Sequence, residues 1–413
     1  MFGKNYEKFA GNEELLKKFA KIVGFDYINK LIEESRPLYD KNIVHVNSTL
    51  YGGGVVEILN DLVIMMNELG IDAEWHQIKG SPEFFTTTKI IHNALQGAKK
   101  GLSSMRKRIY LEVNRRNSIY NHLEDTDCVI IHDPQPLPII NYYKKRQPWI
   151  WRCHIDLSAR NERVWNILHK FVNKYDAMIV SMDKYKQMVD LPQEIIMPSI
   201  NPFNDKNREL SEKKINHYLK KYGIENDKPI ISQISRFDRW KDPIGVVNAF
   251  KIIKKKFDCR LVLLGNMAQD DPEGQEIYQE LLKHVENEPD IIVSTAESSL
   301  LVNTLQTISK VVIQKSIKEG FALTVSEALW KGTPVVGGNV GGIPLQIIDD
   351  KSGYLVNSVE ECADRVLKLL KNPDLAEKMG KAGKEHVRKN FLMTRHLMDY
   401  IKLLKRIAIN YKV

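Results

Sequence analysis

Two glutamates bracket the start of a predicted helix. Glu319 and Glu327 have seven residues between them, and the intervening segment reads Gly-Phe-Ala-Leu-Thr-Val-Ser. An apolar strand over 311–314 comes first, and the helical pattern begins near Thr324. The first amides of a helix lack internal partners and lie at the positive end of its dipole, so they suit a phosphate or carboxylate. Glu327 could accept hydrogen bonds from ribose hydroxyls; the alternative is a structural helix start capped by Thr324.

Two cations follow another apolar strand. Arg236 and Lys241 lie in the segment Ser-Arg-Phe-Asp-Arg-Trp-Lys-Asp, directly after the strand predicted over 230–234. Arginine binds a phosphate group in bidentate fashion and lysine binds it as a point charge, so the two could clamp a diphosphate. An exposed charged turn is the alternative, because the charges of this segment nearly balance.

Glycines and a histidine follow two further strands. Gly52, Gly53 and Gly54 could let backbone amides approach an anion or a sugar closely. No Walker lysine follows, and position 57 is a glutamate, so a P-loop NTPase and an ordinary Rossmann dehydrogenase are both disfavoured. His154 and Asp156 follow the strand that begins at Trp149; a structural histidine is favoured over a metal pair, because no third ligand is near in sequence. No Gly-x-Ser-x-Gly elbow of an α/β-hydrolase occurs.

All these segments come after short apolar runs that alternate with amphipathic ones. This alternation predicts parallel sheets covered by helices on both faces, and ligands bind beyond the carboxyl ends of such strands. Helices are predicted over 55–69, 243–256 and 324–331. The predicted strands are 42–47, 73–78, 128–132, 149–154, 177–181, 195–197, 229–234, 260–264, 291–294, 311–314, 334–336 and 353–356.

The strand series stops and restarts near residues 198–205, a segment with two prolines and little periodicity. We therefore predict two α/β domains, over 1–204 and 205–390, and a helical tail over 391–413. The loops at the strand ends are expected to converge on a cleft between the domains.

Composition sets wider limits. The chain has 413 residues, 43% of them hydrophobic and 27% charged, which fits a globular protein of two domains. A net charge of +9 suits an anionic partner without identifying it. The four cysteines are far apart and are expected to be buried, reduced thiols, which fits the cytoplasm. Neither a secretory signal nor an apolar run long enough to span a bilayer is evident.

Taken together, these motifs resemble the retaining nucleotide-sugar glycosyltransferases of the GT-B fold, family four. The resemblance rests on Glu319 and Glu327 with the Gly-Phe-x-Leu-Thr between them, on Ser-Arg-Phe at 235–237 with Lys241, and on the glycine loop and the His154 strand end. It covers nearly the whole chain. It implies two Rossmann-like domains with a deep cleft between them and a C-terminal helix that crosses back to the first domain.

Longer stretches are similar to the trehalose synthases of the glycosyltransferring type. These stretches are His-Val-Asn-Ser-Thr-x-Tyr-Gly-Gly-Gly-Val at 45–55, Trp-Arg-Cys-His-Ile-Asp-Leu-Ser at 151–158 and Gln-Lys-Ser-x-x-Glu-Gly-Phe at 314–321. Such enzymes join a nucleoside-diphosphate glucose to free glucose, giving the α,α-1,1 disaccharide. One residue departs from the family pattern, because Ala322 stands where a glycine is usual.

The resemblance also implies roles for the site residues. Arg236 and Lys241 would neutralise the departing diphosphate, and Glu319 would hold hydroxyls of the donor glucose. His154 would contact that glucose and the acceptor. The other donor-binding residues would be Phe321, Ala322, Leu323, Thr324 and Glu327, and the other acceptor-binding residues would be Gly53, Gly54, Asp133 and Asp156.

We expect no required metal or other cofactor. Nucleoside-diphosphate glucose would be a co-substrate, and any magnesium would be non-essential. Sugars and nucleotide sugars are the expected partners, without nucleic acid or membrane, and a homodimer stays open. Three alternatives remain. The same donor chemistry could serve another acceptor, such as a lipid reached through the basic stretch 99–116; the enzyme could be a trehalose phosphorylase; or the chain could be a nucleic-acid binder, although it carries no such signature.

Overall fold

A computed structural model describes residues 14–49, 53–265, 273–409 and 411. The chain divides into two compact units. Unit 1 comprises Met1–Ser199 together with Met393–Val413, and unit 2 comprises Ile200–Leu392. The first boundary therefore lies at Ser199 rather than at the predicted residue 204. The tail was predicted over 391–413; Phe391 and Leu392 belong to unit 2, and the part from Met393 onward belongs to unit 1.

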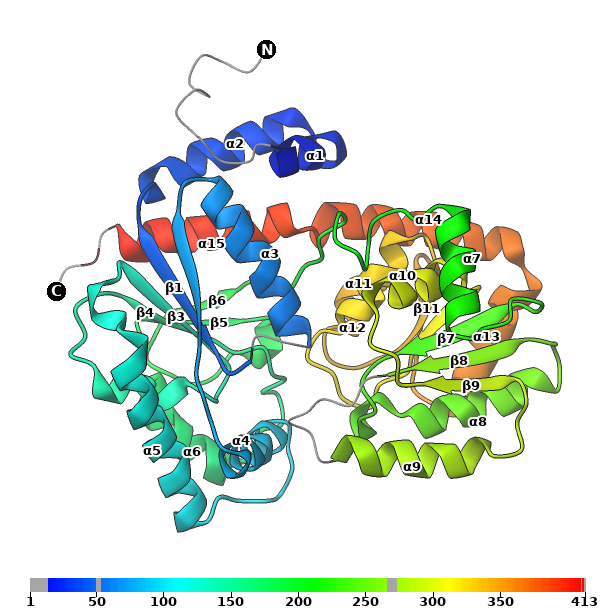
Figure 1. Cartoon of the computed structure of the whole chain (residues 1–413), viewed down its shortest axis with the longest axis horizontal. Helices are drawn as coiled ribbons and strands as arrows, with labels where there is room; N and C mark the ends of the chain where they lie inside the picture. Colours follow the sequence, from blue (N-terminus) through cyan, green and yellow to red (C-terminus); the bar gives the residue numbers. More distant parts are fainter. Residues whose placement is uncertain (1–13, 50–52, 266–272, 410, 412–413) are drawn as a thin grey trace. The chain divides into compact units, whose positions relative to one another are not determined.

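Unit 1 is built on a six-stranded parallel sheet of order β2-β1-β3-β4-β5-β6. Helices cover both faces of this sheet, with α4, α5 and α6 on one side and α3 and α15 on the other (Figure 1). The strands are β1 (Asn42–Asn47), β2 (Asp72–Gln77), β3 (Cys128–His132), β4 (Trp149–Arg152), β5 (Ala177–Val180) and β6 (Gln193–Ile195). The helices are α1 (Glu14–Val23), α2 (Phe25–Ser35), α3 (Gly54–Glu68), α4 (Pro82–Leu95), α5 (Ser104–Asn121), α6 (Glu162–Val172) and α15 (Met393–Ala408).

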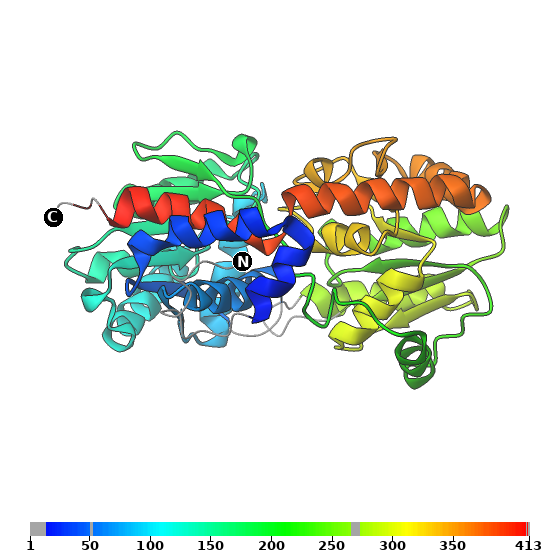
Figure 2. The ribbon, with the colours of Figure 1, turned by 90° about the horizontal axis from the view of Figure 1, so that it is seen from above.

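The last helix, α15, packs within unit 1 although it comes from the far end of the chain. It lies beside α2 (Figure 2) and also contacts α3. An ion pair joins Lys405 Nζ to Glu34 Oε2 at 2.5 Å, and His396 Nδ1 donates to the Met197 carbonyl at 2.7 Å. The C-terminal helix is therefore an integral part of the first α/β unit.

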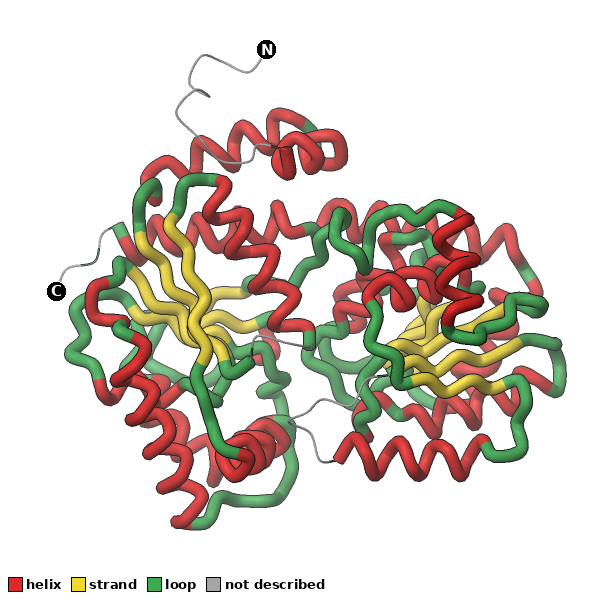
Figure 3. Tube along the Cα trace, viewed as in Figure 1, coloured by secondary structure: helices red, strands yellow, loops and turns green. Residues whose placement is uncertain are grey.

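Unit 2 repeats the plan with a sheet of order β12-β11-β10-β7-β8-β9, again all parallel and covered on both faces (Figure 3). Its strands are β7 (Ile230–Ile234), β8 (Arg260–Leu264), β9 (Ile291–Ser294), β10 (Val311–Gln314), β11 (Val335–Gly338) and β12 (Gly353–Val356). Its helices are α7 (Glu212–Lys221), α8 (Pro243–Lys254), α9 (Glu273–Val285), α10 (Ser299–Ile308), α11 (Leu323–Trp330), α12 (Ile343–Gln346), α13 (Val359–Lys371) and α14 (Pro373–Asn390).

The strands have apolar residues on both faces because helices bury both sides of each sheet. In unit 1, Val44, Val129 and Trp151 point into one large core with α4, α5 and α6. The prediction of an α/β protein with two Rossmann-like halves is confirmed. The four cysteines are buried and unpaired, as expected.

The basic stretch of unit 1 forms part of α5. Tyr110 is its fully buried apolar residue, whereas Ile109, Leu111 and Val113 are only partly buried against the core. Arg115 and Arg116 both bind Glu112 on the same helix, each with 2.9 Å between Nε and a carboxylate oxygen. Among the described residues, no helix is both long and apolar enough to cross a bilayer.

Candidate active site

The two charged segments of unit 2 come together because their strands are neighbours. β7 and β10 are adjacent in the sheet, so the loops after Ile234 and Gln314 leave the same edge. The Ile317 amide donates to the Trp240 carbonyl at 2.8 Å, and Lys318 Nζ lies 4.6 Å from the centre of the Trp240 ring. The loop at 235–242 and the loop at 315–322 therefore form one surface.

Lys241 and Glu319 form an ion pair on this surface. Lys241 Nζ contacts Glu319 Oε2, and the two side chains are only 15% and 9% exposed. Ser316 Oγ lies 3.4 Å from the same oxygen, and Glu319 Oε1 accepts from the Gly320 amide at 3.1 Å. Lys241, expected to bind the diphosphate, and Glu319, expected to bind the sugar, thus compensate each other's charge.

Other charged groups near this pair are held in different ways. Lys315 Nζ contacts Asp242 Oδ2, a pair that the sequence reasoning missed. The Arg236 side chain is 38% exposed, and its Nη2 lies 4.0 Å from Asp238 Oδ2. Arg236 is therefore the more accessible of the two predicted diphosphate cations.

The helix that follows begins at Leu323, one residue before the predicted start. Ala322 is the N-cap, with φ of 69°, and no side chain caps this end, so the alternative of a Thr324 cap is wrong. In the part of the chain that the structure describes, the amides of Leu323 and Thr324 have no acceptor. These amides lie at the positive end of the α11 dipole, which suits an anion. The left-handed backbone at 322 is a conformation that glycine adopts without strain and alanine does not.

Glu327 is held in the interior of unit 2. Its side chain is 3% exposed, and its Oε2 accepts from Gln306 Nε2 on α10 at 2.9 Å. Lys331 Nζ donates to the Glu327 carbonyl at 3.2 Å, and burial lowers the pKa of Lys331 to about 7. The carbonyl of Phe321 accepts from Gln346 on α12, which ties the loop to the next element. Neither Gln306 nor Gln346 carried a signal in the sequence, since both lie within ordinary helical segments.

The predicted acceptor residues lie in unit 1. Gly53 is the N-cap of α3 with φ of 86°, a value that favours glycine, and Gly54 is the first residue of the helix. Gly52 lies outside the described residues. The glycine run is therefore at least partly a conformational requirement of the strand-to-helix turn.

Asp133 and His154 are brought together by the neighbouring strands β3 and β4. Asp133 Oδ1 accepts the His154 amide at 2.7 Å, and the Asp133 amide donates to the Arg152 carbonyl at 2.8 Å. Burial raises the pKa of Asp133 to about 6, against the opposing influence of the His154 amide and of Arg152. Burial also lowers the pKa of His154 well below its usual value, so this ring is neutral at neutral pH.

Asp156 has a local role in the same region. Its Oδ1 accepts from the Ser158 amide at 2.8 Å and from Ser158 Oγ at 2.5 Å. This is the arrangement of an Asx turn, which shapes the loop after β4. Within the described ranges, no group of three or more histidines, cysteines or carboxylates could hold a metal ion.

Known proteins match both units. The family model described as "Trehalose synthase, N-terminal domain" matches residues 45–187, and "Glycosyl transferases group 1" matches residues 214–386. The trehalose synthase of Thermococcus litoralis is 46% identical over 96% of this chain and 98% of its own length. This chain belongs to the trehalose synthase family. The protein is therefore a glycosyltransferase whose activity is related to trehalose.

More distant similarities agree with this assignment. A trehalose phosphorylase of Grifola frondosa is 29% identical over 90% of this chain but only 58% of its own length. An α,α-trehalose-phosphate synthase (UDP-forming) from Burkholderia xenovorans has a similar structure, with a TM-score of 0.72 at 11% identity, covering 88% of this chain and all of the other. At that identity the structural similarity supports the GT-B fold alone.

Proposed function

We propose that the protein transfers glucose from a nucleoside-diphosphate glucose to free glucose, with retention, and forms trehalose in a reversible reaction. The observation that carries this proposal is the group of charges in unit 2. Arg236 and Lys241 lie in the loop that forms one surface with the loop of Glu319. The loop of Glu319 leads into α11, whose first amides have no acceptor among the described residues. Cations and free amides suit a diphosphate, while a carboxylate beside them suits sugar hydroxyls.

In this mechanism the donor is bound by unit 2. Arg236, Lys241 and the amides of Leu323 and Thr324 stabilise the charge that develops on the leaving diphosphate, which is the largest electrostatic demand of the reaction. Glu327 binds the ribose. For that role the carboxylate needs an oxygen in addition to the Oε2 that Gln306 occupies.

Glu319, together with the Phe321 amide, binds hydroxyls of the donor glucose. Its contact with Lys241 orients the carboxylate and links sugar binding to diphosphate binding. A role as a covalent nucleophile is less well supported. The ammonium of Lys241 stabilises the carboxylate and so lowers its nucleophilicity, whereas a ligand for hydroxyls needs only a fixed acceptor.

Retention then follows from attack on the face that the diphosphate leaves. The acceptor hydroxyl bonds to the anomeric carbon as the bond to the phosphate oxygen breaks, and that oxygen takes the acceptor's proton. The acceptor is bound by unit 1, through Asp133, His154 and the loop at Gly53 and Gly54. A neutral His154 contacts the sugars as a hydrogen-bonding group without placing a charge beside them.

The test is to incubate the protein with UDP-, ADP- or GDP-glucose and free glucose and to identify the product. We expect a non-reducing disaccharide with at least one donor, and we expect Arg236→Ala and Glu327→Ala to abolish nearly all turnover. Lys254→Ala is a control, because this lysine pairs with Asp258 and Asp290 outside the proposed site. Full turnover in both site variants would refute the site.

The same experiment separates the alternatives. Inorganic phosphate could occupy the diphosphate site, and trehalose cleavage that needs phosphate rather than a nucleoside diphosphate would identify a phosphorylase. Donor hydrolysis without disaccharide from glucose would indicate another acceptor.

A further inference from the structure

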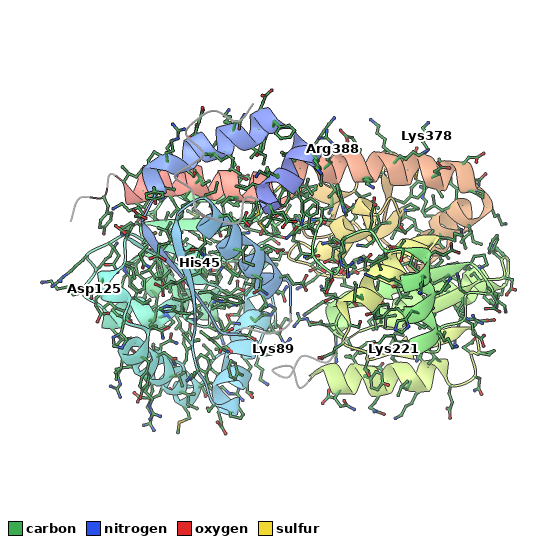
Figure 4. All side chains as sticks on the ribbon, turned by 45° about the horizontal axis from the view of Figure 1, so that its top comes forward. His45, Lys89, Asp125, Lys221, Lys378 and Arg388 are labelled. Carbon is green, nitrogen blue, oxygen red and sulfur yellow. The ribbon has the colours of Figure 1, made fainter. Side chains whose placement is uncertain are left out.

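Three histidines of unit 1 form a hydrogen-bonded row that ends at His154. His45 Nδ1 lies 3.0 Å from His132 Nε2, and His132 Nδ1 lies 3.0 Å from His154 Nε2. The ring centres are 5.2 and 5.4 Å apart. His45, labelled in Figure 4, lies on β1, His132 ends β3 and His154 follows β4, which are consecutive strands of the sheet. The row is thus built into the rigid part of the unit.

The surroundings of the row keep it uncharged. His45 and His132 are almost completely buried, and burial lowers the pKa of His45 to about 3 and the pKa of His132 well below its usual value. Arg152 from β4 adds a positive charge that opposes protonation of His132 and His154. The α15 helix contributes His396, which burial also holds neutral, and Tyr400. Hence each imidazole of the row carries a single N–H at neutral pH.

With one proton per ring, the row has two arrangements. In the first, His45 donates from Nδ1 to His132, His132 donates from Nδ1 to His154, and His154 carries its own proton on Nδ1. In the second, every proton is on Nε2, and the N–H of His45 points into the interior. Among the described residues, His45 Nε2 is buried without a partner. A buried N–H without an acceptor is rarer than an unsatisfied acceptor, which favours the first arrangement.

We propose that His45 and His132 are positioning residues that hold His154 as its Nδ1–H tautomer, so that His154 presents a hydrogen-bond donor to an oxygen of the bound sugars. His132 engages Nε2 of His154, so Nδ1 is the ring nitrogen of His154 that is left available to a ligand. The inference rests on the proposed function for its substrate. The tautomer itself is a property of the free protein.

The row would exclude one of the two tautomers of His154. A neutral histidine on a loop populates both tautomers, and only the Nδ1–H form can donate from that atom. The contact with His132 also fixes the plane of the His154 ring, while the Asp133 carboxylate fixes its backbone through the 2.7 Å hydrogen bond. Loss of His132 should therefore reduce the rate of transfer more than it reduces donor affinity.

The first test compares three variants by kcat, KM and melting temperature. His132→Leu should lower kcat by about 10- to 100-fold, by analogy with the loss of an outer-shell partner that orients a metal-bound histidine, with a smaller change in the donor KM. His132→Asn should recover most of this loss, because the asparagine amide occupies the place of Nδ1 and can donate to His154. His396→Leu is the matched control, since it removes another buried histidine whose hydrogen bond, among the described residues, goes to the Met197 carbonyl.

The melting temperature of the His396→Leu control should fall as that of His132→Leu does, while its kcat should stay within about twofold of the wild-type value. Equal kcat losses in the two leucine variants, or no rescue by asparagine, would overturn the proposal.

The second test reads the tautomer in the ligand-free protein by NMR of ¹⁵N-labelled histidine, with the His154 signals assigned by difference from His154→Gln. We expect a protonated Nδ1 and an unprotonated Nε2.

A protonated Nε2 on His154 would overturn the inference whatever the kinetics show. If the wild-type protein forms no disaccharide with any donor, the proposed function fails, while the NMR result still decides the tautomer. The two failures are therefore distinguishable.

Discussion

Neutralising the Glu319 carboxylate should strengthen the binding of a nucleoside diphosphate while it impairs transfer. In the ligand-free protein, Lys241 donates to Glu319, so a diphosphate must compete for this ammonium and must also lie near a carboxylate. Glu319→Gln keeps the shape of the side chain and removes the charge. Lys241→Met removes the cation that the account assigns to the diphosphate.

The size of the expected change in Kd follows from the contact between Lys241 and Glu319. A hydrogen bond to a charged group contributes about 1.5–3 kcal/mol. Recovering roughly half of this when Glu319 is neutral gives about 0.7–1.5 kcal/mol, or roughly a 4- to 12-fold lower Kd for the nucleoside diphosphate. Lys241→Met should raise the Kd at least about tenfold by the same reasoning. Both variants should lose transfer, Glu319→Gln because the donor glucose loses its hydroxyl ligand.

The assay is calorimetric titration of UDP, ADP and GDP into the wild type, both single variants and the double variant. Lys254→Met serves as a control for general loss of positive charge and should bind within about twofold of the wild type. Thermal unfolding of the same set should show that the double variant loses less stability than the sum of the singles, because each single leaves a mostly buried charge uncompensated. A Kd for Glu319→Gln that rises as much as that of Lys241→Met would show that Glu319 does not compete with the diphosphate for Lys241.

Two further predictions concern single residues outside this ion pair. Ala322→Gly should raise the stability of unit 2 by up to about 1 kcal/mol, because relief of a left-handed alanine outweighs the added chain entropy; the measurement is chemical denaturation, and a loss of stability would contradict the strain at 322. Asp133 has a pKa raised to about 6 from 3.8, so the folded protein binds this proton more tightly than the unfolded chain. Its contribution is present below about pH 4 and is lost as pH rises through about 6, amounting to at most ~3 kcal/mol. Asp133→Asn should flatten this part of the pH–stability curve, and an unchanged curve would contradict the shift.

The strands were the most predictable part of the fold. β1, β3, β8, β9, β10 and β12 have the predicted bounds. In β3, β8 and β10 every residue is buried because helices cover both faces of the sheet, so these strands are marked by short, mostly apolar runs. β6 was expected at 195–197 but spans Gln193–Ile195. It is an edge strand with only partly buried and exposed residues, so apolar content does not mark its position.

The sequence pointed to candidate residues for a site, but it did not predict the contacts between them. Lys241 and Glu319 are 78 positions apart, and they meet only because β7 and β10 are neighbours in the sheet, an order that local sequence does not specify. The contacts of His132 with His45 and His154 were not predicted for the same reason. A polar residue at the end of the apolar strand Cys-Val-Ile-Ile-His was the available signal, and the order β1-β3-β4 then determines its partners.

We propose above that the protein transfers glucose, with retention, from a nucleoside diphosphate to free glucose. The most direct test of this proposal uses a nucleoside-diphosphate glucose carrying ¹³C at C1, unlabelled glucose and NMR of the product. We expect a non-reducing disaccharide with one labelled and one unlabelled anomeric carbon, both in the α configuration and joined through a single oxygen. A labelled carbon in the β configuration, or label recovered only in free glucose or in glucose phosphate, would contradict it.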